Sequence, residues 1–288
     1  MSDPLESLKS LKYQPKPGRW EALASAPPRR SRRPFAIAGA LLAALLAIGV
    51  FVGTREHGLP MELVVDGVRR TTSLGKSWLE TKPNESATVQ IADIGQVTVE
   101  PGSRVRLLNT GPAQHRLELA KGTLHARVTA PPRLFVVETP TASAIDLGCA
   151  YTLKVTEEGS ELTVESGLVS LAGKGREVTV LEGMRAVSST SRAPTTPVAI
   201  DASPAFIDAV AQFDRDATGV DQLLVLARPA DAATLWHLLP VVPADRRAAV
   251  FGMLRAMVRA PESVTPEGTA DANSPAMQQW FASIIASR

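Results

Sequence analysis

The stretch RLFVVETPTASAIDLGCAYTLKV, residues 133–155, indicates how the central part of the chain folds. Residues 135–139 alternate between two faces, and Pro140 ends this run because proline cannot donate a hydrogen bond to a β ladder. A second alternating run, residues 149–155, follows Gly148, a residue that permits a tight bend or the close approach of a neighbouring strand. The stretch therefore predicts two short β-strands.

The same stretch holds the only cysteine of the chain, Cys149. A reactive thiol needs a cationic or histidine partner that stabilises the thiolate, and no such residue is adjacent in sequence. Cys149 instead shares the apolar face of its run with Tyr151, Leu153 and Val155. We predict that Cys149 is a buried structural residue. A single cysteine also excludes an intrachain disulfide framework and a cysteine-based zinc site within this chain.

The alternation extends outward in both directions, from Met61 to Val187. Short runs such as ATVQI, RVRLL, ELTVE and EVTVL alternate apolar with polar residues, and turn sequences such as DG, PG and GKG separate the runs. No helical stretch interrupts them, which argues against a parallel βαβ architecture. We predict a mainly β domain over residues 58–188, of the sandwich, barrel or solenoid type.

Five segments of this region, taken in order, resemble the FecR-type periplasmic domain. They are WLETKPNESATVQIADIGQVTVEPGSRVRLL, HRLELAKGTLHARV, RLFVVETPTASAIDLGCAYTLKV, LTVESGLVSLAG and VTVLEGMRAV. No single segment is specific, but the ordered set is. The family pattern falls on Leu119, Gly122, Val128, Phe135, Val137, Thr139, Pro140, Leu147, Gly148, Tyr151 and Leu153.

The resemblance implies a twisted, solenoid-like β domain and a role in transmembrane signalling to an alternative sigma factor. It does not imply catalysis. The chain departs from the family pattern in three places. Cys149 stands where many members have threonine. The segment before the apolar run has only 33 residues, and the helical domain with which members bind sigma factors is longer. The C-terminal third lacks the β-α signalling domain with which the ferric-citrate regulators dock an outer-membrane receptor.

The C-terminal third has a different periodicity. Residues 189–200 form a polar, proline-containing linker, and helical spacing of apolar residues follows it. A Ser-Pro pair, typical of a helix N-cap and its first residue, occurs at 203–204 and again at 274–275. We predict a small all-α module of four or five helices over residues 201–287.

An apolar segment near the N-terminus, FAIAGALLAALLAIGVFVG at residues 35–53, has no charge over 19 residues. As a helix it spans roughly 28 Å, close to the hydrocarbon thickness of a bilayer. We predict a single-pass inner-membrane protein of a Gram-negative-type bacterium, with the N-terminus cytoplasmic and the β and α parts periplasmic. The alternatives are a cleaved signal peptide and a buried core helix. By the positive-inside rule, the topology follows from Arg29, Arg30, Arg32 and Arg33.

The basic tail, residues 1–33, carries eight Lys/Arg against three Asp/Glu. Its segment DPLESLKSLK has a helix-start pattern with one apolar side. Such a short amphipathic piece can dock on a partner or lie on lipid; the alternative is a disordered tail in the free state. The candidate partner-binding residues are Leu5, Leu8, Leu11 and Trp20.

Several kinds of chemistry are missing from the sequence. The formal net charge of +2 implies no large basic surface for nucleic acid. The histidines at 57, 115, 125 and 237 lack metal-ligand spacing; His115 and His125 fall in predicted adjacent strands, and we interpret them as strand-edge residues. No nucleophile elbow, phosphate loop or dinucleotide fingerprint is present. We predict neither an enzyme nor a cofactor or metal site, and no particular small-molecule ligand is indicated.

These observations lead to a regulatory prediction. The chain is expected to be a membrane-anchored FecR-like protein that relays an envelope signal, with lipid around residues 35–53 and a sigma factor or another protein as partner. The alternative is an anchored periplasmic binding module for cell-wall glycan or an envelope protein, without cytoplasmic output.

Overall fold

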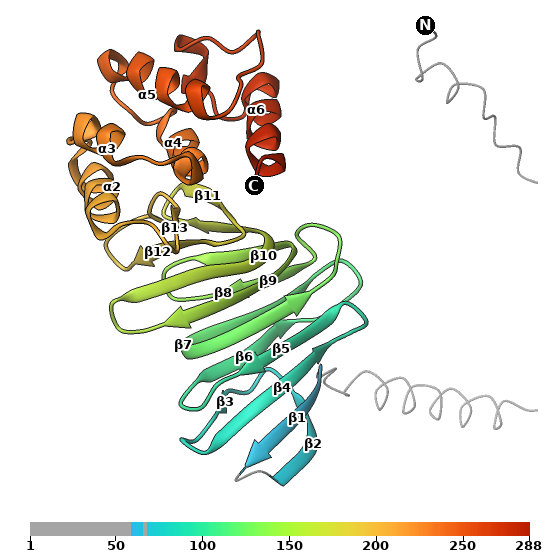
Figure 1. Cartoon of the computed structure of the whole chain (residues 1–288). Helices are drawn as coiled ribbons and strands as arrows, with labels where there is room; N and C mark the ends of the chain where they lie inside the picture. Colours follow the sequence, from blue (N-terminus) through green and yellow to red (C-terminus); the bar gives the residue numbers. More distant parts are fainter. Residues whose placement is uncertain (1–58, 66–67) are drawn as a thin grey trace, which may run out of the picture. The chain divides into compact units, whose positions relative to one another are not determined.

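A computed structural model describes residues 59–65 and 68–288 of the chain. The β and α parts belong to one compact unit, Glu56–Arg288. Figure 1 shows the strands followed by helices at the C-terminal end. The strands are β1 (Leu59–Val65), β2 (Val68–Leu74), β3 (Leu79–Glu80), β4 (Glu85–Ile91), β5 (Gly95–Val99), β6 (Arg104–Asn109), β7 (His115–Val128), β8 (Phe135–Glu138), β9 (Ser143–Val155), β10 (Gly159–Gly173), β11 (Arg176–Leu181), β12 (Met184–Ser189) and β13 (Val198–Ala199).

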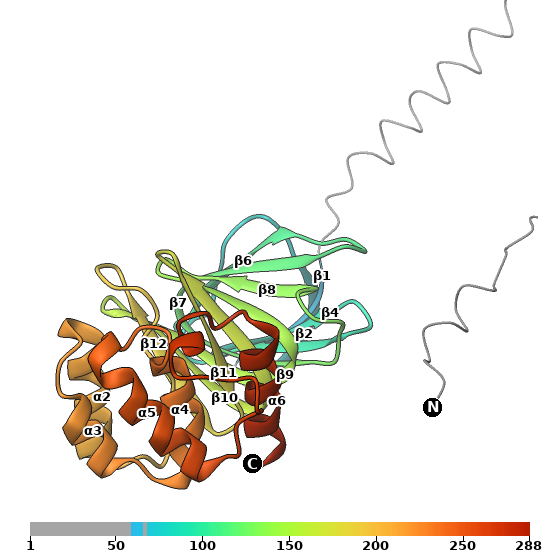
Figure 2. The ribbon, with the colours of Figure 1, turned by 90° about the horizontal axis from the view of Figure 1, so that it is seen from above.

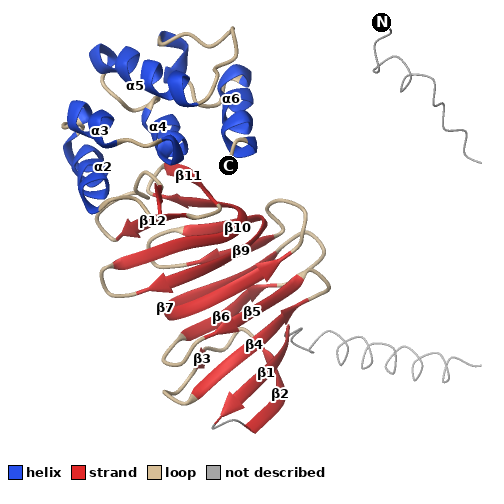
Figure 3. Cartoon of the chain, viewed as in Figure 1, coloured by secondary structure: helices blue, strands red, loops and turns tan. Residues whose placement is uncertain are grey.

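The strands form one 13-stranded sheet within the described residues. Its main order is β13-β12-β10-β9-β8-β7-β5-β4-β1-β2, while β11 pairs with β10, and β6 pairs with both β3 and β7. All pairs are antiparallel except β7 with β8. Figure 3 shows how strands and helices occupy separate parts of the unit. The prediction of a mainly β architecture with a C-terminal α module is confirmed.

The alternation in the sequence positions the core. In β7, for example, Leu117 and Leu119 are buried before Gly122, and Leu124, Ala126 and Val128 are buried after it. The residues between them face outward, and the alternation changes phase at Gly122. The pattern shifts in β9, where register irregularities against β10 surround Gly148 and Gly167. Gly148 has a φ of 94° and Gly167 a φ of 77°, which side chains rarely adopt. This bulge turns Asp146 and Cys149, three residues apart, to the same buried face.

The helical module consists of five α-helices and two short 3₁₀ turns among the described residues. The Ser-Pro starts are as predicted: the Ser203 hydroxyl accepts a hydrogen bond from the N–H of Phe206, and the Ser274 hydroxyl accepts one from Met277. The elements are α2 (Pro204–Asp216), α3 (Val220–Leu226), η3 (Pro229–Asp231), α4 (Ala232–Leu238), α5 (Ala244–Met257), η4 (Glu267–Ala270) and α6 (Pro275–Ala286).

The sheet and the helices share one continuous hydrophobic core, which extends from Leu59 to Ile284. The predicted linker, residues 189–200, contains β13, which pairs with β12. Within it, Thr196, Val198 and Ala199 are buried. This connection is therefore part of the packed unit, and the helical module is held against the end of the sheet.

Among the described residues no helix is long and apolar enough to cross a membrane. The predicted span at 35–53, the arginines before it and the tail residues Leu5, Leu8, Leu11 and Trp20 lie outside the described residues.

Candidate functional site at the junction of sheet and helices

The junction centres on α4 and the neighbouring strand β11, which lie next to each other in Figures 1 and 2. His237 of α4 reaches the strand, and its Nε2 lies 2.9 Å from the carbonyl oxygen of Thr179. Because a carbonyl oxygen only accepts, Nε2 carries the proton and donates it. Nδ1 of His237 is then left with a free lone pair. A single imidazole thus connects the helical module to a backbone group of the sheet.

His237 is enclosed by aromatic side chains. The ring centre of Trp236 lies 5.1 Å from that of His237, and the ring centre of Phe281 lies 5.7 Å away. Burial lowers the pKa of His237 to about 4, while the hydrogen bond to Thr179 opposes this shift and the positive charge of Arg176 adds to it. His237 is therefore neutral at pH 7 in the folded protein.

This pKa shift predicts a loss of stability in acid. The folded pKa of about 4 lies below the ordinary value of 6.5, so the unfolded chain binds the proton more readily. The contribution of His237 is fully present above pH 6.5, falls as the pH drops toward 4, and is lost below that. We expect it to amount to about 3 kcal/mol in the free energy of unfolding.

Urea unfolding of the wild type and of His237→Gln at pH 7 and pH 4 checks this prediction. Glutamine keeps a donor for Thr179 but does not titrate, so the variant should lose less stability than the wild type between the two pH values. An equal loss in both proteins would contradict it.

A second connection at the junction is an ion-pair cluster around Arg176, the first residue of β11. Its Nη1 lies 3.2 Å from Oδ1 of Asp214 on α2, and its Nη2 donates to the hydroxyl of Thr196 at 2.8 Å. Asp214 also accepts from the backbone N–H and the hydroxyl of Thr196, both at 2.7 Å. The Arg176 guanidinium further donates to the carbonyl of Pro194 at 3.0 Å. This cluster links β11, the connecting segment and α2.

A cleft of about 490 Å³ lies beside His237, between the strand and the helices. Ligand sites commonly have volumes of about 300–1,000 Å³. Residues 177–179 of β11 line the cleft, and so does Arg133, which forms an ion pair with Glu177 at 3.0 Å. Apolar and amide side chains complete the lining: Trp236, Pro240, Val241, Ala272, Asn273 and Gln278. The cleft therefore offers hydrogen-bonding groups beside an apolar wall.

A buried polar cluster lies inside the sheet, away from this cleft. Asp146 is fully buried; its carboxylate accepts from the N–H of Gly148 at 2.7 Å and from the thiol of Cys149 at 2.6 Å. Burial raises the pKa of Asp146, and the two hydrogen bonds oppose that shift. Burial and the neighbouring carboxylate both raise the pKa of the Cys149 thiol. Cys149 is thus protonated and poorly nucleophilic, as the sequence predicted.

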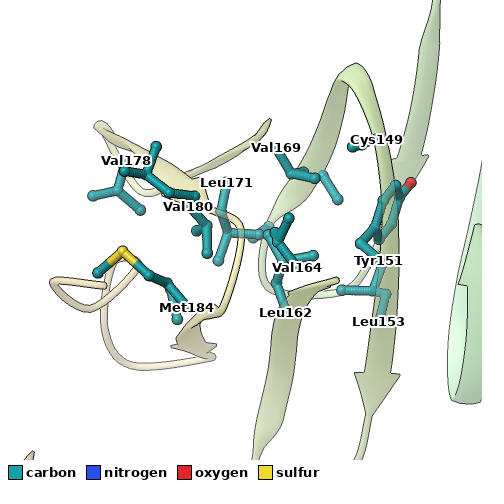
Figure 4. Packing of buried hydrophobic residues seen from close by; sticks show 14 of the residues in the cluster. Cys149, Tyr151, Leu153, Leu162, Val164, Val169, Leu171, Val178, Val180 and Met184 are labelled. Atoms are coloured by element: carbon teal, nitrogen blue, oxygen red, sulfur yellow. The ribbon is translucent and has the colours of Figure 1, made fainter. Parts of the chain in front are cut away.

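Tyr151 completes this cluster and is fully buried beside Cys149 and Leu153 (Figure 4). Its hydroxyl has no hydrogen-bond partner among the described residues, and burial raises its pKa well above the usual range. An unpartnered buried hydroxyl costs about 1–3 kcal/mol of desolvation.

Replacing Tyr151 by phenylalanine should therefore raise the free energy of unfolding by about 1 kcal/mol or more, because the substitution keeps the ring and removes only the hydroxyl. Thermal unfolding of both proteins measures the difference. Tyr151→Ala is the matched control, and it should instead lose about 3–5 kcal/mol through the cavity. A destabilised Tyr151→Phe variant would show that the hydroxyl has a partner.

Sequence reasoning missed Asp146 and the role of His237. Asp146 lies two residues before Gly148 inside an alternating run. A glycine at such a place is the one sequence signal of the β-bulge that turns Asp146 inward. The prediction that His115 and His125 occupy adjacent strands is wrong, since both lie in β7. His125 is not at a strand edge either, because β5 and β9 pair on its two sides. Among the described residues no group of three potential metal ligands occurs.

Comparisons with known proteins give one family match, on the β part of the chain. The family model described as "FecR protein" matches residues 77–170, which run from β3 into β10. A search of curated proteins finds no match. Two crystal structures of a "putative anti-sigma factor" from Parabacteroides distasonis ATCC 8503, at 1.65 Å and 2.50 Å resolution, are similar to the chain.

Each of these structures is 18% identical to the chain with a TM-score of 0.38, and the match covers 47% of this chain. It covers 65% and 64% of the two matched chains. The family match covers the strands from β3 into β10. Residues 77–170 of this chain are therefore a FecR domain.

Proposed function

We propose that this protein is a membrane-anchored FecR-like regulator that relays an envelope signal from the periplasm to a sigma factor or another cytoplasmic protein. The observation that carries the proposal is the FecR domain at residues 77–170. Support for the anchor comes from the uncharged segment at residues 35–53 and the four arginines before it. The protein acts by binding and has no catalytic step.

In this proposal the twisted, solenoid-like β domain is the scaffold that receives the signal. The helical module contacts the end of the sheet through the hydrogen bond of His237 and through the ion pair of Arg176 and Asp214. Binding at the junction changes how firmly the module is held, and the tail reports the change by ordering on its partner or by cleavage near the anchor.

Crosslinking in intact cells tests the cytoplasmic output. A photoreactive residue at Leu8, on the apolar side of the tail, should capture a sigma factor that mass spectrometry identifies. The same residue at Ser10, off the line of Leu5, Leu8 and Leu11, is the control and should capture less. Capture of lipid alone, or of nothing, would overturn the proposed output.

Cysteine labelling tests the topology. The native Cys149 is 6% exposed and its pKa is raised, so it contributes little background. A membrane-impermeant maleimide applied to spheroplasts should label Ser191→Cys, an exposed position, and should leave Ser7→Cys unlabelled. Labelling of the tail, or protection of the exposed position, would contradict the proposed orientation.

A second candidate function, binding of cell-wall glycan, is favoured by a polar groove of about 500 Å³ on the first strands. Its lining includes Thr71, Thr88, Gln90 and Gln96, side chains of the kind that hydrogen-bond sugar hydroxyls. Insoluble peptidoglycan should then retain the full chain, and Gln90→Ala with Gln96→Ala should reduce retention at least fivefold. No retention of the wild type would eliminate this candidate.

A further inference from the structure

The outer edge of β11 has a hydrogen-bonding pattern that the turn before it determines. Lys174 and Gly175 connect β10 to β11 with φ angles of 48° and 78°. Two left-handed residues in succession make a two-residue hairpin turn of type I′. In such a hairpin the flanking pair, here Gly173 and Arg176, exchanges hydrogen bonds across the strands. The bonded and non-bonded pairs of residues then alternate along β11.

Following this alternation, Val178 and Val180 bond to β10, whereas Glu177 and Thr179 do not. Within a strand the N–H and C=O of one residue point to the same side. The backbone groups of Glu177 and Thr179 therefore point away from β10. The contact of His237 with the Thr179 carbonyl is independent support, because the imidazole reaches that oxygen from the outer side at 2.9 Å.

The remaining outward groups of Glu177 and Thr179 have no partner within the described chain. These are the N–H and C=O of Glu177 and the N–H of Thr179. They border the cleft of about 490 Å³, which residues 177–179 line. His237 is 9% exposed and lines the same cleft, and its Nδ1 has no partner among the described residues. A row of unsatisfied backbone groups thus faces an accessible space.

We propose that this edge of β11 binds an extended peptide segment of a partner protein as an additional strand. Only a polypeptide backbone presents donors and acceptors at the strand repeat that Glu177 and Thr179 require. The peptide pairs its N–H and C=O with Glu177, and a further C=O accepts from the N–H of Thr179. Nε2 of His237 already donates to the Thr179 carbonyl, so the peptide cannot pair with that oxygen and the added ladder ends there. Nδ1 of His237 accepts a hydrogen bond from a donor of the peptide.

Side chains of the bound segment meet two different surroundings. On one side lie Pro240 and Val241, and Val241 is 52% exposed, so an apolar residue of the peptide is preferred there. The exposed ion pair of Arg133 and Glu177, which also lines the cleft, favours polar or charged residues of the peptide. The inference deepens the proposed function, since it rests on the β domain being the part that receives a partner.

The test uses a random heptapeptide library displayed on phage and panned against the purified full chain. Enriched peptides are synthesised and their dissociation constants are measured by fluorescence anisotropy. Thr179→Pro removes the outward N–H at an edge position where proline is tolerated, and should weaken binding at least tenfold. Thr179→Val keeps the N–H and replaces the hydroxyl by a methyl group of similar size, so its affinity should equal that of the wild type. Failure to enrich any peptide, or equal binding by Thr179→Pro, would overturn the proposal.

Hydrogen exchange on the wild type keeps the proposal falsifiable if the proline variant does not fold. In the free protein the amides of Val178 and Val180 should exchange at least tenfold more slowly than those of Glu177 and Thr179. An enriched peptide should then slow the Glu177 and Thr179 amides at least tenfold. Equal protection of all four amides without peptide, or no change on adding it, would refute the open edge.

These readouts are separate from the test of the regulatory output. Peptide binding at β11 together with no capture from Leu8 would leave the binding edge standing and remove the relay to the cytoplasm. Capture of a sigma factor together with no peptide binding would support the relay to the cytoplasm and remove the binding edge.

Discussion

Replacing Gly122 by alanine is expected to lower the free energy of unfolding by about 3–5 kcal/mol. Gly122 lies in β7 with a φ of 93°, a left-handed conformation that costs an alanine about 1–2 kcal/mol. An added Cβ would also lie 2.5 Å from the Cα of Ser103 and 2.2 Å from its hydroxyl oxygen. Ser103 cannot move aside, because it is fully buried and its hydroxyl bonds to the backbone of Thr123.

Two further glycines separate backbone strain from overlap in the same urea-unfolding experiment. Gly175 has a φ of 78° with nothing within 4 Å of its Cβ position, so Gly175→Ala should lose only about 1–2 kcal/mol. Gly252 lies in α5 with open space around it, so Gly252→Ala should gain up to about 1 kcal/mol. If Gly122→Ala lost no more than Gly175→Ala, the close approach to Ser103 would be ruled out.

Replacing Asp214 by alanine is expected to cost about 3–5 kcal/mol. The Asp214 side chain is 10% exposed and that of Arg176 is 26% exposed, so the substitution leaves a largely buried guanidinium without its carboxylate. The hydrogen bonds from the N–H and hydroxyl of Thr196 are lost as well. The damage should concentrate at the junction, since this cluster joins β11 to α2.

The matched control for this prediction is Asp208→Ala. Asp208 lies on the same helix, α2, and is exposed, so its replacement should change stability by less than about 0.5 kcal/mol. The amide hydrogens of α2 should also exchange faster in Asp214→Ala than in the control, because the helix detaches more readily from β11. Equal stability of the two variants would mean that the ion pair contributes nothing to the junction.

Most of the secondary structure was predictable because local rules decide it. Alternating apolar residues predicted the strands of the sheet. The two Ser-Pro pairs predicted where two helices begin, and the hydroxyls of Ser203 and Ser274 cap those helices. The burial of Cys149 followed from the face that it shares with Tyr151. Each of these features depends on neighbours within a few residues, so a single sequence contains the information.

The candidate site was not predictable in the same way. His237 has an ordinary place on a helix in the sequence, and only the docking of α4 on β11 brings it to the carbonyl of Thr179. Arg176 and Asp214 are 38 residues apart, and no periodicity relates them. The cleft likewise draws its lining from β11, α4 and α6, which meet only after the helical module has packed against the sheet.

The sequence by itself determined that this chain has a β domain with the FecR pattern, a helical C-terminal part and a core thiol, because periodicity and capping act over short distances. Only the tertiary structure decided that Asp146 lies inside the sheet and that β11 presents an open edge to the helices. The physical reason is that a bulge and a strand edge are defined by hydrogen bonds to distant partners. Those partners are chosen when the whole unit packs.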